Sequence, residues 1–386
     1  MDAVSLVLHS VRLVDDGRDA ADTWLLVRGG RVAARGTGTS WRDAVAAHPV
    51  DEVIDGAAVA GVDAIVVPGF IDIHGHGGGG AAYDDGAEAI RVARELHRAH
   101  GTTRAVVSLV TAPVDELARR VAAIADLAEA DATVLGSHLE GPFLDPGHHG
   151  AHDPALLVTP ASDAVARLLE AGRGTVRQVT IAPELPGAIA AIERIVGARA
   201  AAAVGHTDAD AATARRAFDA GATILTHAFN AMPGLHHRAP GPIGAATGDP
   251  RVTLEVIADG VHLAPEIVRI AFAAAPGRVA LVTDAMAAAG AADGDYVLGA
   301  LAVRVERTVA RLADGTIAGS TLTQDAALRT AVSAGVPLVD AVAALTSVPA
   351  RAIARPDLGS LAVGHPADIV LLDAGLAVRR VWTGRV

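Results

Sequence analysis

The middle of the chain alternates apolar runs with alanine-rich segments of helical periodicity, and this alternation constrains the fold most. Eight runs are predicted as strands: 64–73, 104–111, 133–139, 176–182, 201–205, 222–226, 252–258 and 278–283. Five intervening segments are predicted as helices: 86–100, 113–130, 187–198, 208–220 and 264–275. Eight strand–helix units predict a closed (β/α)8 TIM barrel. A doubly wound open sheet is the competing layout. It is less favoured, because the sequence has no glycine-rich phosphate fingerprint after the first predicted strand.

The two ends of the chain have a different pattern. Short β-like segments separated by turns are found there, at 4–14, 23–36, 50–60, 367–373 and 378–386. Two distant β segments that flank a long middle suggest one small sheet built from both termini. We therefore predict that residues 1–63 and 356–386 form a small β-sandwich domain, and that residues 64–355 form the catalytic barrel.

Composition excludes several classes of function. The chain has no cysteine, which excludes thiol nucleophiles, thiolate ligands and disulfides. It also has no lysine, which excludes a Schiff base and a lysine general base. The net charge of −12 argues against nucleic-acid binding, and no apolar run approaches the roughly 20 residues of a membrane helix. Met1 to Val14 lack a basic start followed by an apolar core, so we expect no secretory signal and a cytoplasmic location.

Side chains that can bind metals follow six of the eight predicted strands. His74 and His76 close the first strand, and residues two apart on a strand point to the same side. Others close later strands: Glu140, His206, His227, His262 and Asp284. In a barrel these strand ends share one face, where such enzymes place their active sites. So many histidines and carboxylates at strand ends are not expected by chance.

These residue types predict metal-assisted hydrolysis of an amide or a similar bond. Imidazole and carboxylate groups bind zinc and similar cations, and such a cation lowers the pKa of water to about 7. Asp284 could accept the proton of that water and deliver it to the leaving group. His262 could donate a hydrogen bond to the developing oxyanion.

Each group also has a structural interpretation. Glu140 or His206 could cap a helix, and His227 could be a core histidine. These structural interpretations are less favoured, because the residues follow neighbouring predicted strands. The roles of His148 and His149, in a glycine-rich loop, are left open.

The chain resembles a known enzyme family. The His74-x-His76 pair, the eight strands and the terminal β layer resemble the amidohydrolase superfamily. Five segments resemble its N-acetylglucosamine-6-phosphate deacetylase branch: HLEGPFL (138–144), GHTDA (205–209), THAFNAM (226–232), IADGVH (257–262) and LVTDA (281–285). Other branches bridge two metals with a carboxylated lysine, whereas this branch uses a glutamate. That difference agrees with the absence of lysine.

The resemblance implies a set of metal ligands. The main metal would be held by Glu140, His206 and His227, while His74 and His76 imply a second metal bridged by Glu140. One or two divalent cations are expected per subunit, with zinc favoured and iron, manganese or cobalt as alternatives. Asp284 corresponds to the catalytic acid and base, and His262 to a histidine near the acetyl group.

The resemblance also implies substrate contacts. They are Ala151, His152, Asn230, Ala231, His237, Arg238, His262, Ile317, Ala318 and Gly319. The guanidinium of Arg238 offers paired donors for a phosphate. In the family this arginine reaches the neighbouring subunit's site, which implies a homodimer. Ala239 departs from the pattern, because the family often has an acidic residue there.

The expected activity is metal-dependent hydrolysis of the acetamide of N-acetyl-D-glucosamine 6-phosphate in amino-sugar catabolism. The products would be acetate and D-glucosamine 6-phosphate. One alternative is a related hydrolase that acts on N-acetylgalactosamine 6-phosphate or on an N-acyl amino acid. An alternative from a different class is a non-catalytic barrel that serves as a scaffold.

Overall fold

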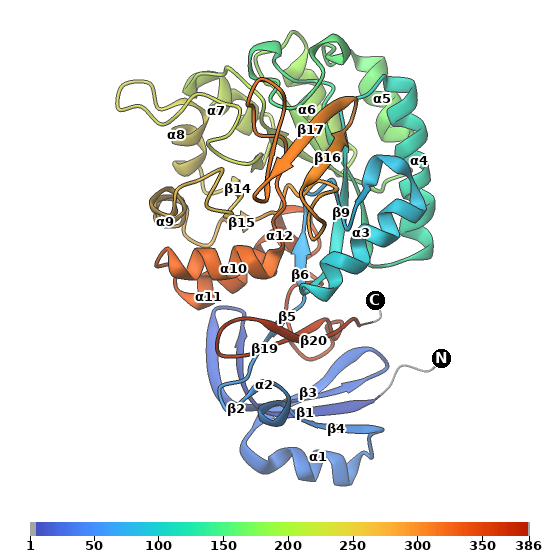
Figure 1. Cartoon of the computed structure of the whole chain (residues 1–386), viewed down its shortest axis with the longest axis vertical. Helices are drawn as coiled ribbons and strands as arrows, with labels where there is room; N and C mark the ends of the chain where they lie inside the picture. The colour runs from blue at the N-terminus through green and yellow to red at the C-terminus, as the bar shows by residue number, and fades with distance from the viewer. Residues whose placement is uncertain (1–4, 385–386) are drawn as a thin grey trace.

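Eight parallel strands form the larger sheet of the computed structural model, which describes residues 5–384 (Figure 1). They are β6 (Phe70–Asp72), β9 (Thr102–Val110), β10 (Val134–Glu140), β11 (Val176–Ile181), β12 (Ala201–Val204), β13 (Ile224–Leu225), β14 (Thr253–Val256) and β15 (Val279–Leu281). They pair in sequence order, and every neighbouring pair is parallel. This is the order of a barrel.

The two edge strands of this sheet, β6 and β15, are joined by individual hydrogen bonds instead of a ladder. The backbone N of Asp284 donates to the carbonyl oxygen of His74 over 2.8 Å. The side-chain Nε2 of Gln324 donates to the carbonyl oxygens of Ile71 (3.0 Å) and Leu281 (3.4 Å), one from each edge strand. The sheet is therefore a nearly closed (β/α)8 barrel, and the predicted fold is confirmed.

Ten helices accompany the barrel in the described residues. They are α3 (Ala87–Ala99), α4 (Val114–Ala130), α5 (Ser162–Ala171), α6 (Ala188–Gly197), α7 (Ala211–Asp219), α8 (Gly241–Thr247), α9 (Pro265–Ala274), α10 (Gln324–Ser333), α11 (Leu338–Leu345) and α12 (Ser347–Ala352). The five predicted helices correspond to α3, α4, α6, α7 and α9. No helix of the described chain combines the length and apolarity needed to cross a lipid bilayer.

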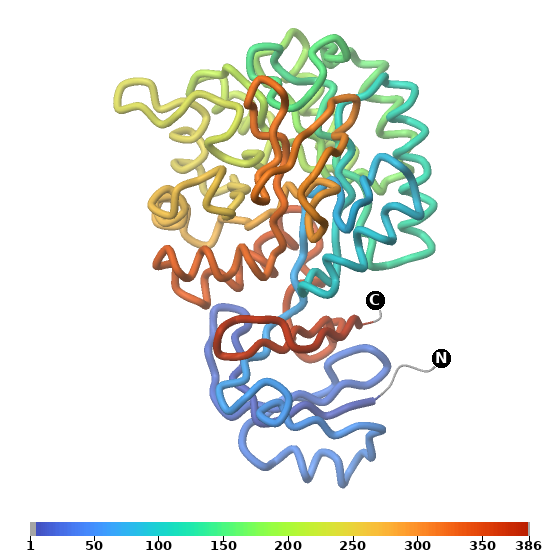
Figure 2. Tube along the Cα trace, viewed as in Figure 1, coloured from blue at the N-terminus to red at the C-terminus, as the bar shows by residue number. Residues whose placement is uncertain are grey.

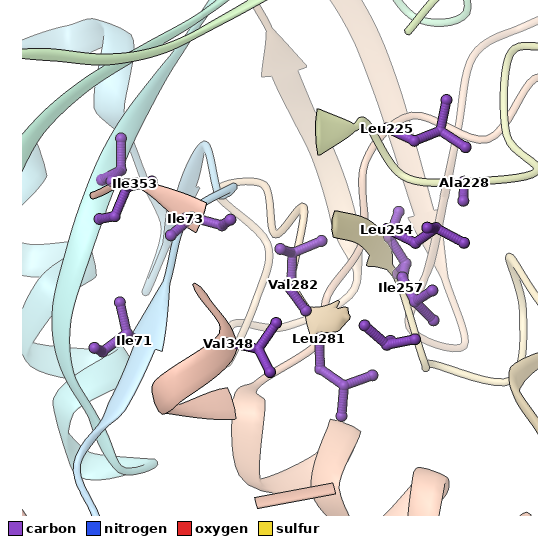
Figure 3. Close-up of a cluster of buried hydrophobic side chains, with 14 of the residues drawn as sticks. Ile71, Ile73, Leu225, Ala228, Leu254, Ile257, Leu281, Val282, Val348 and Ile353 are labelled. Atoms are coloured by element: carbon purple, nitrogen blue, oxygen red, sulfur yellow. The ribbon is translucent and has the colours of Figure 1, made fainter. Parts of the chain in front are cut away.

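The barrel strands are buried on both faces, which explains their nearly continuous apolar sequences. Every residue of β9 and of β10 is buried. Figure 3 shows Ile71 and Ile73 of the β6 segment with Leu281 and Val282 of the β15 segment, and Val348 of α12 in the same cluster. This packing gives the strand ends a rigid base.

A seven-stranded sheet contains strands from both ends of the chain (Figure 2). Its strands are β1 (Leu6–Asp15), β2 (Arg18–Arg28), β3 (Arg31–Thr37), β4 (Glu52–Asp55), β5 (Ile65–Pro68), β19 (Ile369–Leu372) and β20 (Val378–Trp382). Two short helices, α1 (Trp41–Ala47) and α2 (Gly56–Ala60), accompany them. Side chains of β1, β2, β5 and β19 enclose one apolar cluster, which includes Leu8, Leu25, Val66 and Ile369.

The predicted first barrel strand, 64–73, is wrong in one respect, because it is two strands in two sheets. β5 pairs with β19 in the terminal sheet, whereas β6 pairs with β9 in the barrel. The chain changes sheets at Gly69, whose N donates to the carbonyl oxygen of Asp368 over 2.7 Å. A Cβ at Gly69 would lie 2.2 Å from Thr103 Oγ1, so only glycine fits there. The domain limits at 63/64 and 355/356 remain proposals. Because β5 belongs to the terminal sheet, Gly69 is a better position than 63/64 for the first boundary between the two domains.

Two small antiparallel sheets between the main elements were not predicted. One consists of β16 (Gly294–Leu298), β17 (Leu301–Glu306) and β18 (Val309–Arg311), and the other of β7 (Gly77–Gly78) and β8 (Ala81–Ala82). Leu298, at the end of β16, lines the cavity described below. The larger of these sheets therefore contributes to the wall of the site.

Candidate metal and active site

The histidines and carboxylates that close the barrel strands converge at one point. Glu140 is the last residue of β10, and the other side chains come from the segments that follow β6, β12, β13 and β15. All of these side chains are buried: His74, His76, Glu140, His206, His227 and Asp284. The structure thus brings together every residue predicted to bind a metal, together with the predicted acid and base.

One group of donors surrounds the first carboxylate oxygen of Glu140. Glu140 Oε1 lies 3.1 Å from His206 Nε2 and 3.0 Å from His227 Nε2. The two Nε2 atoms are themselves 3.0 Å apart. Three donor atoms at such mutual distances can bind a single cation.

A second group of donors contacts the same carboxylate, and its His74 Nε2 lies 3.2 Å from Glu140 Oε1. Glu140 Oε2 lies 3.0 Å from His76 Nε2, and His76 Nε2 lies 3.3 Å from His74 Nε2. Asp284 Oδ1 completes the group, 3.2 Å from His76 Nε2. Glu140 therefore belongs to both groups of donors.

The chemistry of this cluster fits a divalent cation. Within the described chain, no arginine lies within ion-pair distance of Glu140 or Asp284, although both are buried. Buried carboxylates need a positive partner. In addition, close pairs of imidazole nitrogens cannot all be satisfied as hydrogen bonds, because a neutral ring has one donor. A cation among the donors satisfies both requirements.

Proton affinities in the cluster are strongly perturbed. Burial alone would raise the pKa of Asp284, but the hydrogen bond from His76 and the charge of His74 lower it to about 2. Burial alone would lower the pKa of His76, but hydrogen bonds to Asp284 and Glu140 raise it to about 9. Bound cations would replace the protons on these rings, because an imidazole ligand must be neutral at its coordinating nitrogen. Asp284 is ionised in either case and can accept a proton.

Three of these residues have a strained backbone. His206, His227 and Asp284 have positive φ angles of 47°, 24° and 49°, which non-glycine residues rarely adopt. Such conformations persist where the surroundings enforce them and are concentrated at functional sites. His206 is also oriented from its far side, because its Nδ1 donates to the carbonyl oxygen of His148 over 2.9 Å.

A cavity of about 350 Å³ opens over the cluster. Seven of the predicted substrate contacts line it: Ala151, His152, Asn230, Ala231, His262, Ile317 and Gly319. His152 also lies 3.5 Å from Glu140 Oε2, and its Nδ1 hydrogen-bonds with Thr111 Oγ1 over 2.8 Å. The cavity walls therefore bring polar groups and apolar surface close to the proposed ligands.

Three predicted contacts do not line this cavity. Ala318 is fully buried, and its backbone N donates to the carbonyl oxygen of Ala310, so its side chain packs within the protein. His237 and Arg238 are exposed on the segment between β13 and α8, which projects from the body of the molecule (Figure 2). There Arg238 Nη1 contacts His237 Nε2 over 2.6 Å. Within one chain, these two residues are not part of the site.

Two acidic residues that position site histidines had no predicted role. Glu255 lies within β14, and its Oε2 accepts a hydrogen bond from His74 Nδ1 over 2.9 Å. Asp259 Oδ2 accepts one from His262 Nδ1 over 2.7 Å. A signal for Glu255 existed in the sequence, since a carboxylate interrupts the apolar run from Leu254 to Ala258.

Comparison with known proteins agrees with this geometry. Residues 65–383 match the amidohydrolase family. The chain belongs to the amidohydrolase family. This member is 39% identical over 324 residues to the N-acetylgalactosamine-6-phosphate deacetylase of Escherichia coli O157:H7. The matched region spans 82% of this chain and 86% of that protein. It is 31% identical to the N-acetylglucosamine-6-phosphate deacetylase of Bacillus subtilis, over 97% of this chain and 95% of that protein.

Solved structures of related amidohydrolases have the same architecture. One is a variant of the N-acetyl-D-glucosamine-6-phosphate deacetylase of Mycobacterium smegmatis, in complex with N-acetyl-D-glucosamine-6-phosphate. It is 43% identical to this amidohydrolase, with a TM-score of 0.91 over 98% of each chain. The resemblance noted in the sequence is thereby confirmed.

Proposed function

We propose that this amidohydrolase hydrolyses the acetamide of N-acetyl-D-glucosamine 6-phosphate to acetate and D-glucosamine 6-phosphate. The main support is the cluster of imidazole and carboxylate donors around Glu140 at the base of a cavity of about 350 Å³. The 43% identity to an enzyme whose structure contains this substrate supports the choice of sugar. The reaction belongs to amino-sugar catabolism, which we expect to take place in the cytoplasm.

The residues present can hold one or two divalent cations. His206, His227 and Glu140 would hold the first, and His74 and His76 the second, with Glu140 shared. Zinc suits nitrogen and oxygen ligands of this kind, and iron, manganese or cobalt are alternatives. When bound, such a cation polarises the amide carbonyl and lowers the pKa of a water to about 7.

Asp284 is proposed to move the proton. Its low pKa leaves it ionised at neutral pH, so it can accept the proton of the attacking water. It can then deliver that proton to the amine of the sugar as the C–N bond breaks. Its position on the cavity wall beside His76 agrees with this role.

His262 is proposed to stabilise the charge that develops on the amide oxygen. It lines the cavity, and Asp259 holds its Nδ1, which leaves Nε2 available to donate. Burial alone would lower the pKa of His262, but the hydrogen bond to Asp259 raises it. A histidine that keeps its proton is a suitable donor to an oxyanion.

Arg238 and His237 are proposed to bind the phosphate in the site of a partner subunit. Their exposed position on a projecting segment, away from the cavity of their own chain, supports this proposal. The planar guanidinium can form paired hydrogen bonds with a phosphate. The active form would then be a homodimer.

The epimeric sugar is a second candidate substrate. A relative with 39% identity is named for N-acetylgalactosamine 6-phosphate. The two sugars can be compared directly by acetate release at matched concentrations. We expect a higher kcat/KM for the glucosamine compound, and the reverse order would favour the epimer.

The proposal is tested by measuring acetate release from N-acetyl-D-glucosamine 6-phosphate before and after chelation. We expect turnover by the purified protein, loss after a chelator is added and removed, and recovery when Zn²⁺ is restored. A protein that binds Zn²⁺ but releases acetate from neither phosphosugar would contradict the proposal. That result would favour the non-catalytic scaffold.

A further inference from the structure

Glu255 is a buried carboxylate that no step of the proposed reaction uses. It lies in the middle of β14 and is fully inaccessible to solvent. Within the described residues, no lysine or arginine pairs with it, so its charge has no basic partner other than a histidine. An unpaired buried charge is costly, which suggests that this acid has a specific role.

The contacts of Glu255 connect it to the donors of both proposed cation positions. Its Oε2 accepts from His74 Nδ1 over 2.9 Å and from the backbone N of His227 over 3.3 Å. Its Oε1 accepts from Gln178 Nε2 over 2.7 Å. These partners come from β11 and from the segments after β6 and β13, so the interaction crosses the interior of the barrel.

This contact determines which nitrogen of His74 is free to bind a cation. A carboxylate can only accept, so His74 must carry a hydrogen on Nδ1. In the neutral ring, the lone pair is then on Nε2, which faces Glu140 and His76. A carboxylate partner also makes the coordinating nitrogen more basic.

His74 differs in this respect from the other imidazoles of the cluster. His206 Nδ1 donates to a neutral carbonyl oxygen. The Nδ1 atoms of His76 and His227 are buried and have no hydrogen-bond partner in the described chain. Among these four rings, His74 is therefore the one whose Nδ1 meets a carboxylate.

We propose that Glu255 is a positioning residue that fixes the tautomer of His74 and so sets cation affinity at the position formed by His74 and His76. This inference rests on the proposed cation-dependent function. It assigns a role to a residue outside the ligand set. Gln178 supports that role, because its hydrogen bond holds the carboxylate in place.

The test uses Glu255→Gln, which preserves side-chain volume. With its amide oxygen held by Gln178 Nε2, the new amide presents N–H groups to His74 Nδ1, which then requires the other tautomer. We expect Zn²⁺ affinity of the metal-free protein to fall about 10- to 100-fold for one binding event. The measurement is competition with a coloured chelator. Thr180→Val is the matched control, because Thr180 is buried at a similar depth and bonds His138 and Thr226 but no proposed ligand.

A double-variant cycle separates this role from a structural one. If Glu255 acts through His74, Glu255→Gln should change Zn²⁺ affinity less than threefold when His74→Ala is already present. Equal losses in both backgrounds, or unchanged affinity in the otherwise wild-type chain, would overturn the proposal. If Glu255→Gln does not fold, Glu255→Asp keeps the charge but withdraws it from Nδ1, and the same loss is expected. Because Zn²⁺ binding is read without substrate, failure of the deacetylase proposal would be seen separately.

Discussion

At the scale of single residues, Asp284 carries the largest predicted effect on activity. We expect Asp284→Asn to lower turnover about 10²- to 10⁴-fold, because the amide cannot accept a proton from water. Zn²⁺ held by His206, His227 and Glu140 should remain bound. Acetate release and metal content of the same preparation measure the two effects. Asp208→Asn serves as a control, because Asp208 is an exposed carboxylate in the segment after β12 and is not part of the cluster.

Near-normal turnover of Asp284→Asn would contradict the proposal that Asp284 transfers the proton. Complete loss of metal together with activity would show that Asp284 acts mainly as a ligand of the position that it shares with His76.

The sequence predicted the ligands better than the residues that orient them. His74, His206 and His227 each follow a recognisable strand, and parallel strands end at one edge of a barrel, so their convergence could be inferred. Glu255 contacts His74 across 181 positions of sequence. Nothing local indicates that pairing, since it depends on which interior side chains reach each other across the barrel.

At the scale of elements, α3 and α10 are joined by a polar contact whose strength depends on pH. His100, which follows α3, donates from Nδ1 to Asp325 Oδ1 of α10 over 3.0 Å. Arg329 Nη1 donates to the other oxygen of Asp325 over 2.9 Å. Burial would raise the pKa of Asp325, but hydrogen bonds from His100, Thr323 and Arg329 lower it. The hydrogen bond to Asp325 also raises the pKa of His100 above its usual value of 6.5.

The sign of each shift defines the pH range over which this contact stabilises the fold. The lowered pKa of Asp325 contributes stability above about pH 4, which is lost as pH falls toward the folded value. The raised pKa of His100 contributes stability below about pH 6.5, which is lost as pH rises through the folded value. The contribution is therefore largest between about pH 4 and 6.5.

We expect Asp325→Asn to lower the free energy of unfolding by about 2–3 kcal/mol in that range, because bonds to a charged group are lost. The difference from wild type should shrink on both sides of the range. Chemical denaturation of the two proteins from pH 3 to 9 measures it. A difference that stays constant with pH would show that packing, rather than charge, is responsible.

Helices and strands were predicted well where the hydrophobic residues of the sequence recur with a clear helical or strand period. The helix predicted at 113–130 is α4 (Val114–Ala130), and the strand predicted at 176–182 is β11 (Val176–Ile181). The segment 64–73 was predicted as one strand because both of its halves are apolar. Its division at Gly69 depends on Asp368 and Thr103, which are distant in sequence.

At the scale of the whole molecule, Arg238 tests whether two chains share a site. Arg238→Ala should lower kcat/KM for the phosphorylated sugar about 10- to 100-fold, because a hydrogen-bonded charge pair is lost. The effect on unphosphorylated N-acetylglucosamine should be small. Arg215→Ala, an exposed arginine on α7, is the control. Equal losses of kcat/KM for both sugars would contradict the proposal that Arg238 binds the phosphate.

Mixed assemblies make this prediction sharper. A dimer of one Arg238→Ala chain and one Asp284→Asn chain would contain one site with an intact Asp284 and an intact Arg238 from the other subunit. We therefore expect mixing the two impaired proteins, under conditions that exchange subunits, to give more activity than the sum of the separate proteins. No restoration in confirmed hybrids would place Arg238 outside the partner's site.

The position of β5 between β1 and β19 has a consequence for synthesis on the ribosome. β1 precedes β5 in the chain, but β19 follows it by about 300 positions, which takes roughly 15 to 60 s to translate. During that interval the apolar edge of β5 has no neighbour on one side, and open edges of this kind favour aggregation. All eight barrel strands are translated in the same interval. The nascent barrel can therefore fold beside an unfinished sheet, which closes only when β19 emerges.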